Sequence, residues 1–132
     1  MNMTIGKVAK EAGIGVETVR FYEREGLIAQ PRQTTGYRQY DQDIVKKLRF
    51  IRRAKDLGFT LGEIKELLEL RLNPRSRCSN VKEQAQRKIQ NIQQKIRTLQ
   101  RMKRALVKLT EACNGNGSTG DCPILDTLEK EQ

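Results

Sequence analysis

The longest stretch of the chain without proline or glycine includes all of residues 79–112. Its apolar residues recur every three or four positions, which predicts one long helix with a nearly heptad stripe along one side. A lone helix cannot bury such a stripe, and a chain with 36% hydrophobic residues has little other apolar surface to cover it. We therefore expect a homodimeric coiled coil. The stripe consists of Val81, Ala85, Ile89, Ile92, Ile96, Leu99, Met102, Leu106 and Leu109.

Two short helices are expected before residue 27. The first extends from Thr4, whose hydroxyl can cap it, to Gly13, which ends it. The second covers residues 16–25 and ends at Gly26, with Val16 and Val19 directed inward. Two helices joined by a short turn with glycine are typical of a helix-turn-helix, whose second helix enters the major groove of DNA. The side chains of that helix expected to direct polar or aromatic groups away from the core are Thr18, Arg20 and Tyr22.

Residues 27–40 contain two short extended stretches on either side of a turn at Thr35 and Gly36. This pattern predicts a β-hairpin, or wing. Strand alternation places Tyr37 with Gln39 on one face and Arg38 with Tyr40 on the other, so each face offers an aromatic ring or a cation. Such a hairpin suits contact with phosphates beside the groove. The alternative is an ordinary amphipathic hairpin that covers the core.

Two further helices complete the N-terminal part. Asp41 begins one that Gly58 ends, and Thr60 with Glu63 has the spacing of a capping box at the start of the next. A polar stretch with proline at 73–77 marks the boundary. The expected fold is mainly α. It comprises a winged helix-turn-helix DNA-binding head over 1–73, a hinge and an antiparallel coiled-coil dimerisation helix over 74–112, and a metal-binding loop with a short C-terminal helix over 113–132.

Three cysteines lie at the two ends of the long helix. Cys113 and Cys122 flank a glycine-rich loop of eight residues, so they can meet. Cys78 precedes the helix, about 50 Å from its far end at 1.5 Å per residue. An antiparallel partner would place Cys78 of one subunit beside Cys113 and Cys122 of the other. The expectation is two equivalent three-thiolate metal sites per dimer.

The chain contains no histidine, so only carboxylates such as Asp121, or water, can supplement sulfur. Sulfur ligands favour soft ions, and three of them suit Hg(II), Cd(II), Pb(II) or, with an added oxygen ligand, Zn(II). The alternative is three unrelated buried thiols, which a glycine-rich loop between two of them disfavours. An odd number of cysteines without an export signal argues for reduced thiols rather than a disulfide framework.

The net charge of +10 and the pI near 9.9 favour a polyanionic partner such as nucleic acid, although many soluble proteins are simply basic. The excess of positive charge is spread over both halves of the chain, so it does not indicate which part would bind nucleic acid. The chain has no apolar run long enough to span a bilayer and no signal peptide, so a cytoplasmic protein without membrane contact is expected. Without histidine or a phosphate-binding loop, an enzyme is not expected.

Four stretches of the sequence together resemble the MerR family of bacterial transcription regulators. They are IGKVA at 5–9, ETVRFYEREGLI at 17–28, GYRQY at 36–40 and LGFTLGEI at 57–64. The resemblance extends over essentially the whole chain. It implies a homodimer on a pseudo-palindromic promoter operator, with an effector pocket at the end of an antiparallel coiled coil. It also implies activation by distorting an over-long promoter spacer so that bound RNA polymerase engages both promoter elements.

The resemblance also implies which residues contact DNA. By position, Thr18, Arg20 and Tyr22 correspond to the family's recognition helix, and Tyr37 and Arg38 to its wing. A weaker candidate for a phosphate contact is Arg53.

The triad of Cys78, Cys113 and Cys122 matches the family's mercury sensors, including the eight-residue gap. The family's copper(I) sensors carry serine in place of Cys78, and its zinc sensors have additional cysteine or histidine ligands. Cadmium and lead sensors share the triad but usually have a shorter gap, and redox sensors hold four cysteines. The expectation is a Hg(II)-responsive regulator that represses when empty and activates when loaded. The alternatives are a sensor of Cd(II), Pb(II) or Zn(II), a thiol-based redox switch, or a metal buffer whose DNA binding is incidental.

Overall fold

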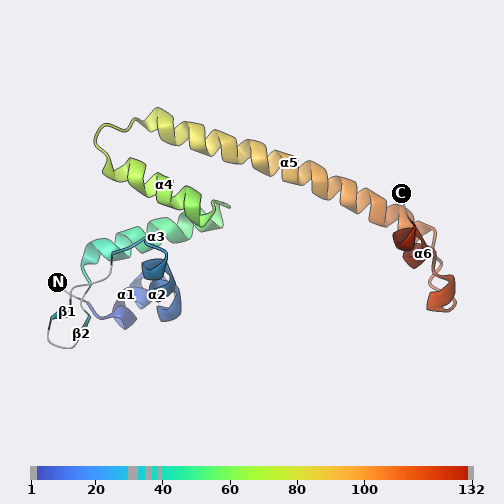
Figure 1. Ribbon diagram of the computed structural model, residues 1–132, viewed down its shortest axis with the longest axis horizontal. Helices are drawn as coiled ribbons and strands as arrows, with labels where there is room; N and C mark the ends of the chain where they lie inside the picture. Colours follow the sequence, from blue (N-terminus) through green and yellow to red (C-terminus); the bar gives the residue numbers. More distant parts are fainter. Residues whose placement is uncertain (1–2, 30–32, 35–36, 39, 131–132) are drawn as a thin grey trace. The chain divides into compact units, whose positions relative to one another are not determined.

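A computed structural model of the chain describes residues 3–29, 33–34, 37–38 and 40–130, with the backbone alone for 33–34 and 37–38 (Figure 1). These residues form two compact units, one ending at Lys82 and the other beginning at Glu83. The functional division into 1–73, 74–112 and 113–132 stays a prediction. Among the described helices, none combines the length and hydrophobicity that crossing a membrane requires.

The described residues are mainly helical, as expected. The helices of the first unit, which we call the head, are α1 (Ile5–Ala12), α2 (Val16–Arg24), α3 (Gln42–Asp56) and α4 (Leu61–Leu72). The head also contains the short strands β1 (Gln33–Thr34) and β2 (Tyr37–Arg38). Then follow the long helix α5 (Cys78–Glu111), a 3₁₀ turn η1 (Thr119–Asp121) and the short helix α6 (Pro123–Glu129).

The turn between α1 and α2 is built as the sequence predicts. The hydroxyl of Thr4 accepts a hydrogen bond of 3.3 Å from the backbone N–H of Lys7, which caps the start of α1. Gly13 ends α1 with φ +74°, a left-handed conformation that favours glycine. A side chain at Gly13 would also meet Arg52, because a Cβ there would overlap Nη1 of that arginine.

The wing is an antiparallel pair of β1 and β2, in which Gln33 faces Arg38 and Thr34 faces Tyr37. The predicted hairpin is thereby confirmed, while its turn residues Thr35 and Gly36 lie outside the described residues. Beyond β2, Tyr40 exchanges two backbone hydrogen bonds of 2.8 Å with Met3. This bridge attaches the chain after the wing to the segment before α1.

The core of the head lies between α1, α2, α3 and α4. Apolar residues one helical turn apart point inward from each helix, and each fully buried aliphatic side chain contributes about 1.5–3 kcal/mol through removal from water. The capping box predicted before α4 is present, because Thr60 and Glu63 exchange hydrogen bonds of 2.8 and 3.2 Å. The principal buried side chains are Val8, Ala9, Ala12, Val19, Tyr22, Tyr40, Val45, Leu48, Ile51, Ile64 and Leu68.

The predicted long helix is confirmed as the 34-residue helix α5, drawn as one continuous ribbon in Figure 1. Most of its apolar stripe faces solvent, with exposed fractions from 39% at Ile92 to 62% at Leu99. Nothing among the described residues covers this stripe. An exposed apolar surface of this kind on a helix marks an interaction site.

Candidate DNA interface and metal centre

The second helix of the helix-turn-helix, α2, presents Arg20 to solvent. Its guanidinium Nη1 lies 2.9 Å from Oε1 of Glu17, and the two side chains are 49% and 79% exposed. An exposed pair of this kind is held by only about 0.2–1 kcal/mol. Arg20 is therefore able to leave Glu17 for a stronger anionic partner. Thr18, in the first turn of the same helix, is half-buried.

The expectation that Tyr22 forms an exposed tip of α2 is wrong. The side chain is 4% exposed, and its burial raises the pKa of the phenol above its ordinary value. Tyr22 follows the buried Val19 by three residues, and residues three apart share a helix face. This spacing is a sequence signal for burial. A DNA contact by Tyr22 stays a prediction, and the burial leaves only a small part of the ring to make it.

The wing residues Tyr37 and Arg38 form strand β2, paired with β1. Their side chains lie outside the described residues, so their contact with DNA stays a prediction. Arg53 is exposed on α3, where it pairs with no carboxylate in the described part of the chain. It is therefore available for a phosphate contact.

Two other arginines of α3 have a structural role that the sequence pattern did not reveal. Arg49 donates to the backbone carbonyl of Glu11 at 3.1 Å, and Arg52 donates to that of Ala12 at 3.5 Å. These carbonyls lie at the C-terminal end of α1, where the helix dipole is negative. The two cations thus join α3 to the end of the first helix of the helix-turn-helix. A sequence spacing of about forty residues carries no sign of this contact.

A buried polar link in the head was also missed. The hydroxyl of Tyr40 donates a hydrogen bond to Oε1 of Glu23, and the two residues are 1% and 7% exposed. Glu23 belongs to α2, and Tyr40 follows the wing. The link therefore connects the recognition helix to the end of the wing. Buried carboxylates need such partners because an unpaired one is costly.

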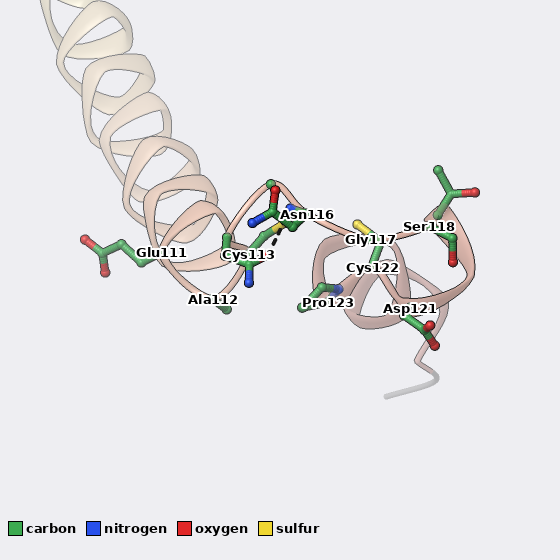
Figure 2. Close-up of a pocket in the computed structure, with 12 residues that line it drawn as sticks. Glu111, Ala112, Cys113, Asn116, Gly117, Ser118, Asp121, Cys122 and Pro123 are labelled. Carbon is green, nitrogen blue, oxygen red and sulfur yellow. Dashed lines mark hydrogen bonds between the residues drawn. The ribbon is translucent and has the colours of Figure 1, made fainter.

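Cys113 and Cys122 line one pocket of about 470 Å³ beyond the end of α5 (Figure 2). Both are half-buried free thiols. Cys113 follows the last turn of α5, and Cys122 is the N-cap residue of α6, whose first residue is Pro123. The other residues lining the pocket are Glu111, Ala112, Asn114, Gly115, Asn116, Gly117, Ser118, Thr119, Asp121 and Pro123.

The loop between the two cysteines is folded by its glycines and amides. Gly115 and Gly117 have φ values of +81° and +102°, a backbone region that favours glycine. The N–H of Asn116 donates to Oδ1 of Asn114 at 2.9 Å, and that of Asp121 donates to the carbonyl of Ser118 at 3.1 Å. The loop therefore returns Cys122 to the pocket that Cys113 lines.

The third cysteine, Cys78, is exposed at the first position of α5. In the part of the chain that the structure describes, no three cysteine, aspartate or glutamate side chains gather as metal ligands. The pocket therefore offers two thiols from one chain. A third sulfur would have to come from elsewhere.

Comparison with known proteins agrees with this architecture. Residues 3–70 match the model of the MerR HTH family regulatory proteins, and residues 45–109 match the MerR DNA-binding model. The mercuric resistance operon regulatory protein of Bacillus cereus is 42% identical over 99% of the chain and 100% of its own length.

Two solved structures share the fold. The regulator PbrR691 of Ralstonia metallidurans CH34 in complex with lead(II) has a TM-score of 0.87 at 37% identity, covering 96% of this chain and 98% of that one. The regulator MerR of Bacillus megaterium MB1 in complex with mercury(II) has a TM-score of 0.73, also at 37% identity, covering 97% and 100%. These relatives are regulators, so the expectation of a non-enzymatic chain is confirmed. The chain belongs to the MerR family of helix-turn-helix transcription regulators.

Proposed function

We propose that this chain is a Hg(II)-responsive regulator that binds promoter DNA as a homodimer, represses when empty and activates transcription when loaded. One observation carries the proposal. Cys113 and Cys122 line a single pocket, while the third thiol, Cys78, lies at the opposite end of a helix whose apolar stripe is exposed. An antiparallel second copy would cover the stripe and supply the missing sulfur.

The length of α5 supports the sharing of the site between subunits. A 34-residue helix is about 50 Å long at 1.5 Å per residue, so its first and last turns lie far apart within one chain. Antiparallel pairing reverses the direction of the partner helix and brings its first turn to this pocket. The two-fold symmetry of such a dimer creates two identical sites, each with Cys113 and Cys122 of one chain and Cys78 of the other.

The ligand set favours a soft metal ion. Three thiolates without histidine suit Hg(II), and the mercuric resistance relatives of similar length support this ion. The structural likeness to a lead(II)-bound regulator keeps Pb(II) as an alternative, together with Cd(II) and Zn(II). Asp121 and Glu111 also line the pocket and offer oxygen atoms that these harder ions would accept more readily than mercury.

On DNA, the exposed Arg20 of α2 would reach base edges or phosphates in the major groove, and Thr18 in the first turn of the same helix would make a further contact. The wing residues Tyr37 and Arg38 and the exposed Arg53 would hold the phosphate backbone. Metal binding between the two subunits would change their relative orientation. The two heads would then distort the promoter spacer so that bound RNA polymerase engages both promoter elements.

Titration of the reduced full-length protein with Hg(II) tests the shared site. We expect two ions per dimer, with ultraviolet thiolate charge-transfer absorption that Cys78→Ser removes. A sharper test mixes Cys78→Ser chains with Cys113→Ser/Cys122→Ser chains. Neither variant alone holds three thiols in one site, but their heterodimer would recover one complete site. Unchanged absorption in Cys78→Ser, or no recovery in the heterodimer, would sink the cross-subunit model.

Transcription from the chain's own promoter tests the identity of the metal. We expect activation by Hg(II) at lower concentrations than by Cd(II), Pb(II) or Zn(II), because thiolate ligands discriminate in favour of soft ions. Stronger activation by one of the other ions would reassign the effector. Activation by an oxidant in the absence of metal would favour a thiol-based redox switch instead.

A further inference from the structure

The helix α5 is strongly basic along most of its length. Nine lysines and arginines lie between Lys82 and Lys108, and no aspartate or glutamate occurs from residue 84 to residue 110. The exposed face of a long helix ordinarily mixes both signs of charge, which gives stabilising pairs between residues three or four apart. Within the helix, such pairs are possible only at the two ends of this segment, between Glu83 and Arg87 and between Lys108 and Glu111.

Four of these cations form a line on α5, which we call the basic stripe. Its members are Arg97, Arg101, Arg104 and Lys108, spaced by four, three and four residues, and all four are exposed. At 100° per residue, this line lies on the side of the helix opposite the apolar stripe. A dimer that buries the apolar stripe would therefore leave the basic stripe accessible. Arg97, Arg101 and Arg104 also border a shallow groove of about 510 Å³, together with Gln94, Thr98 and Gln100.

The arrangement is unfavourable for the isolated helix. Like charges three or four residues apart repel each other, as Arg97 and Arg101, or Arg101 and Arg104, do here. None of the four cations pairs with a carboxylate among the described residues, and Arg101 makes only a 3.3 Å hydrogen bond to Oγ1 of Thr98. An anionic partner would remove the repulsion and use guanidinium groups that can each donate two hydrogen bonds.

We propose that the basic stripe binds the phosphate backbone of duplex DNA, as a second DNA surface separate from the head. This proposal rests on the proposed function as a DNA-binding regulator. Duplex DNA carries a negative charge about every 1.7 Å along its axis, so a line of cations finds phosphates in any register. An acidic protein would instead need surface carboxylates at the same spacing as the four cations of the basic stripe. Contacts of this kind carry no sequence information and would strengthen binding to any duplex.

The test compares two full-length triple variants with equal loss of charge. Arg97→Gln/Arg101→Gln/Arg104→Gln removes three cations of the stripe, and Lys82→Gln/Lys95→Gln/Lys103→Gln removes three from other faces of α5. Binding to a random-sequence duplex and to the operator is followed by fluorescence anisotropy over a series of salt concentrations. Sedimentation confirms that both variants remain dimers.

We plot the logarithm of the association constant for DNA against the logarithm of the salt concentration. For the stripe variant we expect this slope to be shallower by about 2.7 or more, since each of the three lost phosphate contacts contributes about 0.9. Between 50 and 200 mM salt, wild type would then lose about 40-fold more affinity than the variant. The control variant should keep a slope close to that of wild type. The preference for operator over random duplex should persist in both variants, because the head supplies it.

A slope unchanged in the stripe variant, or lowered equally in both variants, would overturn the proposal. If the stripe variant binds DNA normally but loses binding to a synthetic glutamate-rich helical peptide, the stripe fits an acidic protein and the DNA assignment is wrong. Failure of the wild-type protein to prefer its operator would instead contradict the proposed function itself, which separates the two failures.

Discussion

The hydroxyl of Tyr40 donates a buried hydrogen bond to the carboxylate of Glu23, which joins the residue after the wing to the recognition helix α2. Tyr40 is also bound through its backbone to Met3, ahead of α1. Tyr40 thus connects three segments of the head, through its side chain and its backbone. The relative position of recognition helix and wing therefore depends in part on this contact.

Replacement of Tyr40 by phenylalanine should destabilise the head by about 1–3 kcal/mol, because it leaves a buried carboxylate without this donor. Urea unfolding measures the change. The double variant Tyr40→Phe/Glu23→Leu removes both polar partners and should be less destabilised than the single variant, since no carboxylate then remains buried. If the loss of unfolding free energy in the double variant equals the sum of the losses in the two single variants, the two side chains are not coupled, and the proposed role of the link is wrong.

The buried phenol of Tyr22 predicts a loss of stability at high pH. Its pKa is raised in the folded protein above the ordinary value of 10.0, because burial disfavours the charged form. Well below pH 10 the group is protonated in both the folded and the unfolded state. As pH rises above 10, the unfolded state loses the proton first, and the free energy of unfolding falls.

Urea unfolding at a series of pH values from 8 upward checks this expectation for Tyr22. The variant Tyr22→Phe should show a smaller decline above pH 10 than wild type, while its stability at neutral pH reports the packing of the ring separately. Equal declines in the two proteins would exclude Tyr22 as the source.

Replacement of Arg20 by alanine should weaken operator binding by about 1–3 kcal/mol, the usual contribution of an arginine that contacts a base. Glu17→Gln is the matched control on the same helix face, because it breaks the exposed 2.9 Å pair without removing the cation. It should leave operator affinity equal or higher, since it removes a negative charge next to DNA. Anisotropy titrations measure both, and full affinity and specificity in Arg20→Ala would contradict the assignment of α2 as the recognition helix.

Replacement of Ile96 by glutamate should dissociate the proposed dimer, because it places a charge in the exposed apolar stripe of α5 that a partner helix would bury. Sedimentation equilibrium measures the shift toward monomer. Gln90→Glu introduces the same charge on an exposed position of the opposite face and should leave the dimer intact. A dimer that tolerates Ile96→Glu would mean that the stripe is covered in some other way.

Local patterns in the sequence were sufficient for most of the secondary structure. Thr4 and Gly13 mark the ends of α1, and the pair Thr60 and Glu63 marks the start of α4, because caps act through hydrogen bonds to neighbouring residues. The apolar periodicity of residues 79–112 likewise predicted α5, which begins one residue earlier, at Cys78. Each of these signals acts over a few residues and is therefore visible in the sequence alone.

Contacts between distant segments were decided only by the tertiary structure. The sequence by itself determined the helices, the wing and the grouping of Cys113 with Cys122 around a glycine-rich loop. Only the folded head shows that Tyr40 reaches Glu23 and that Arg49 and Arg52 bind the end of α1. The physical reason is that such contacts depend on how helices pack against each other, and packing brings together residues whose separation along the chain carries no periodic signal.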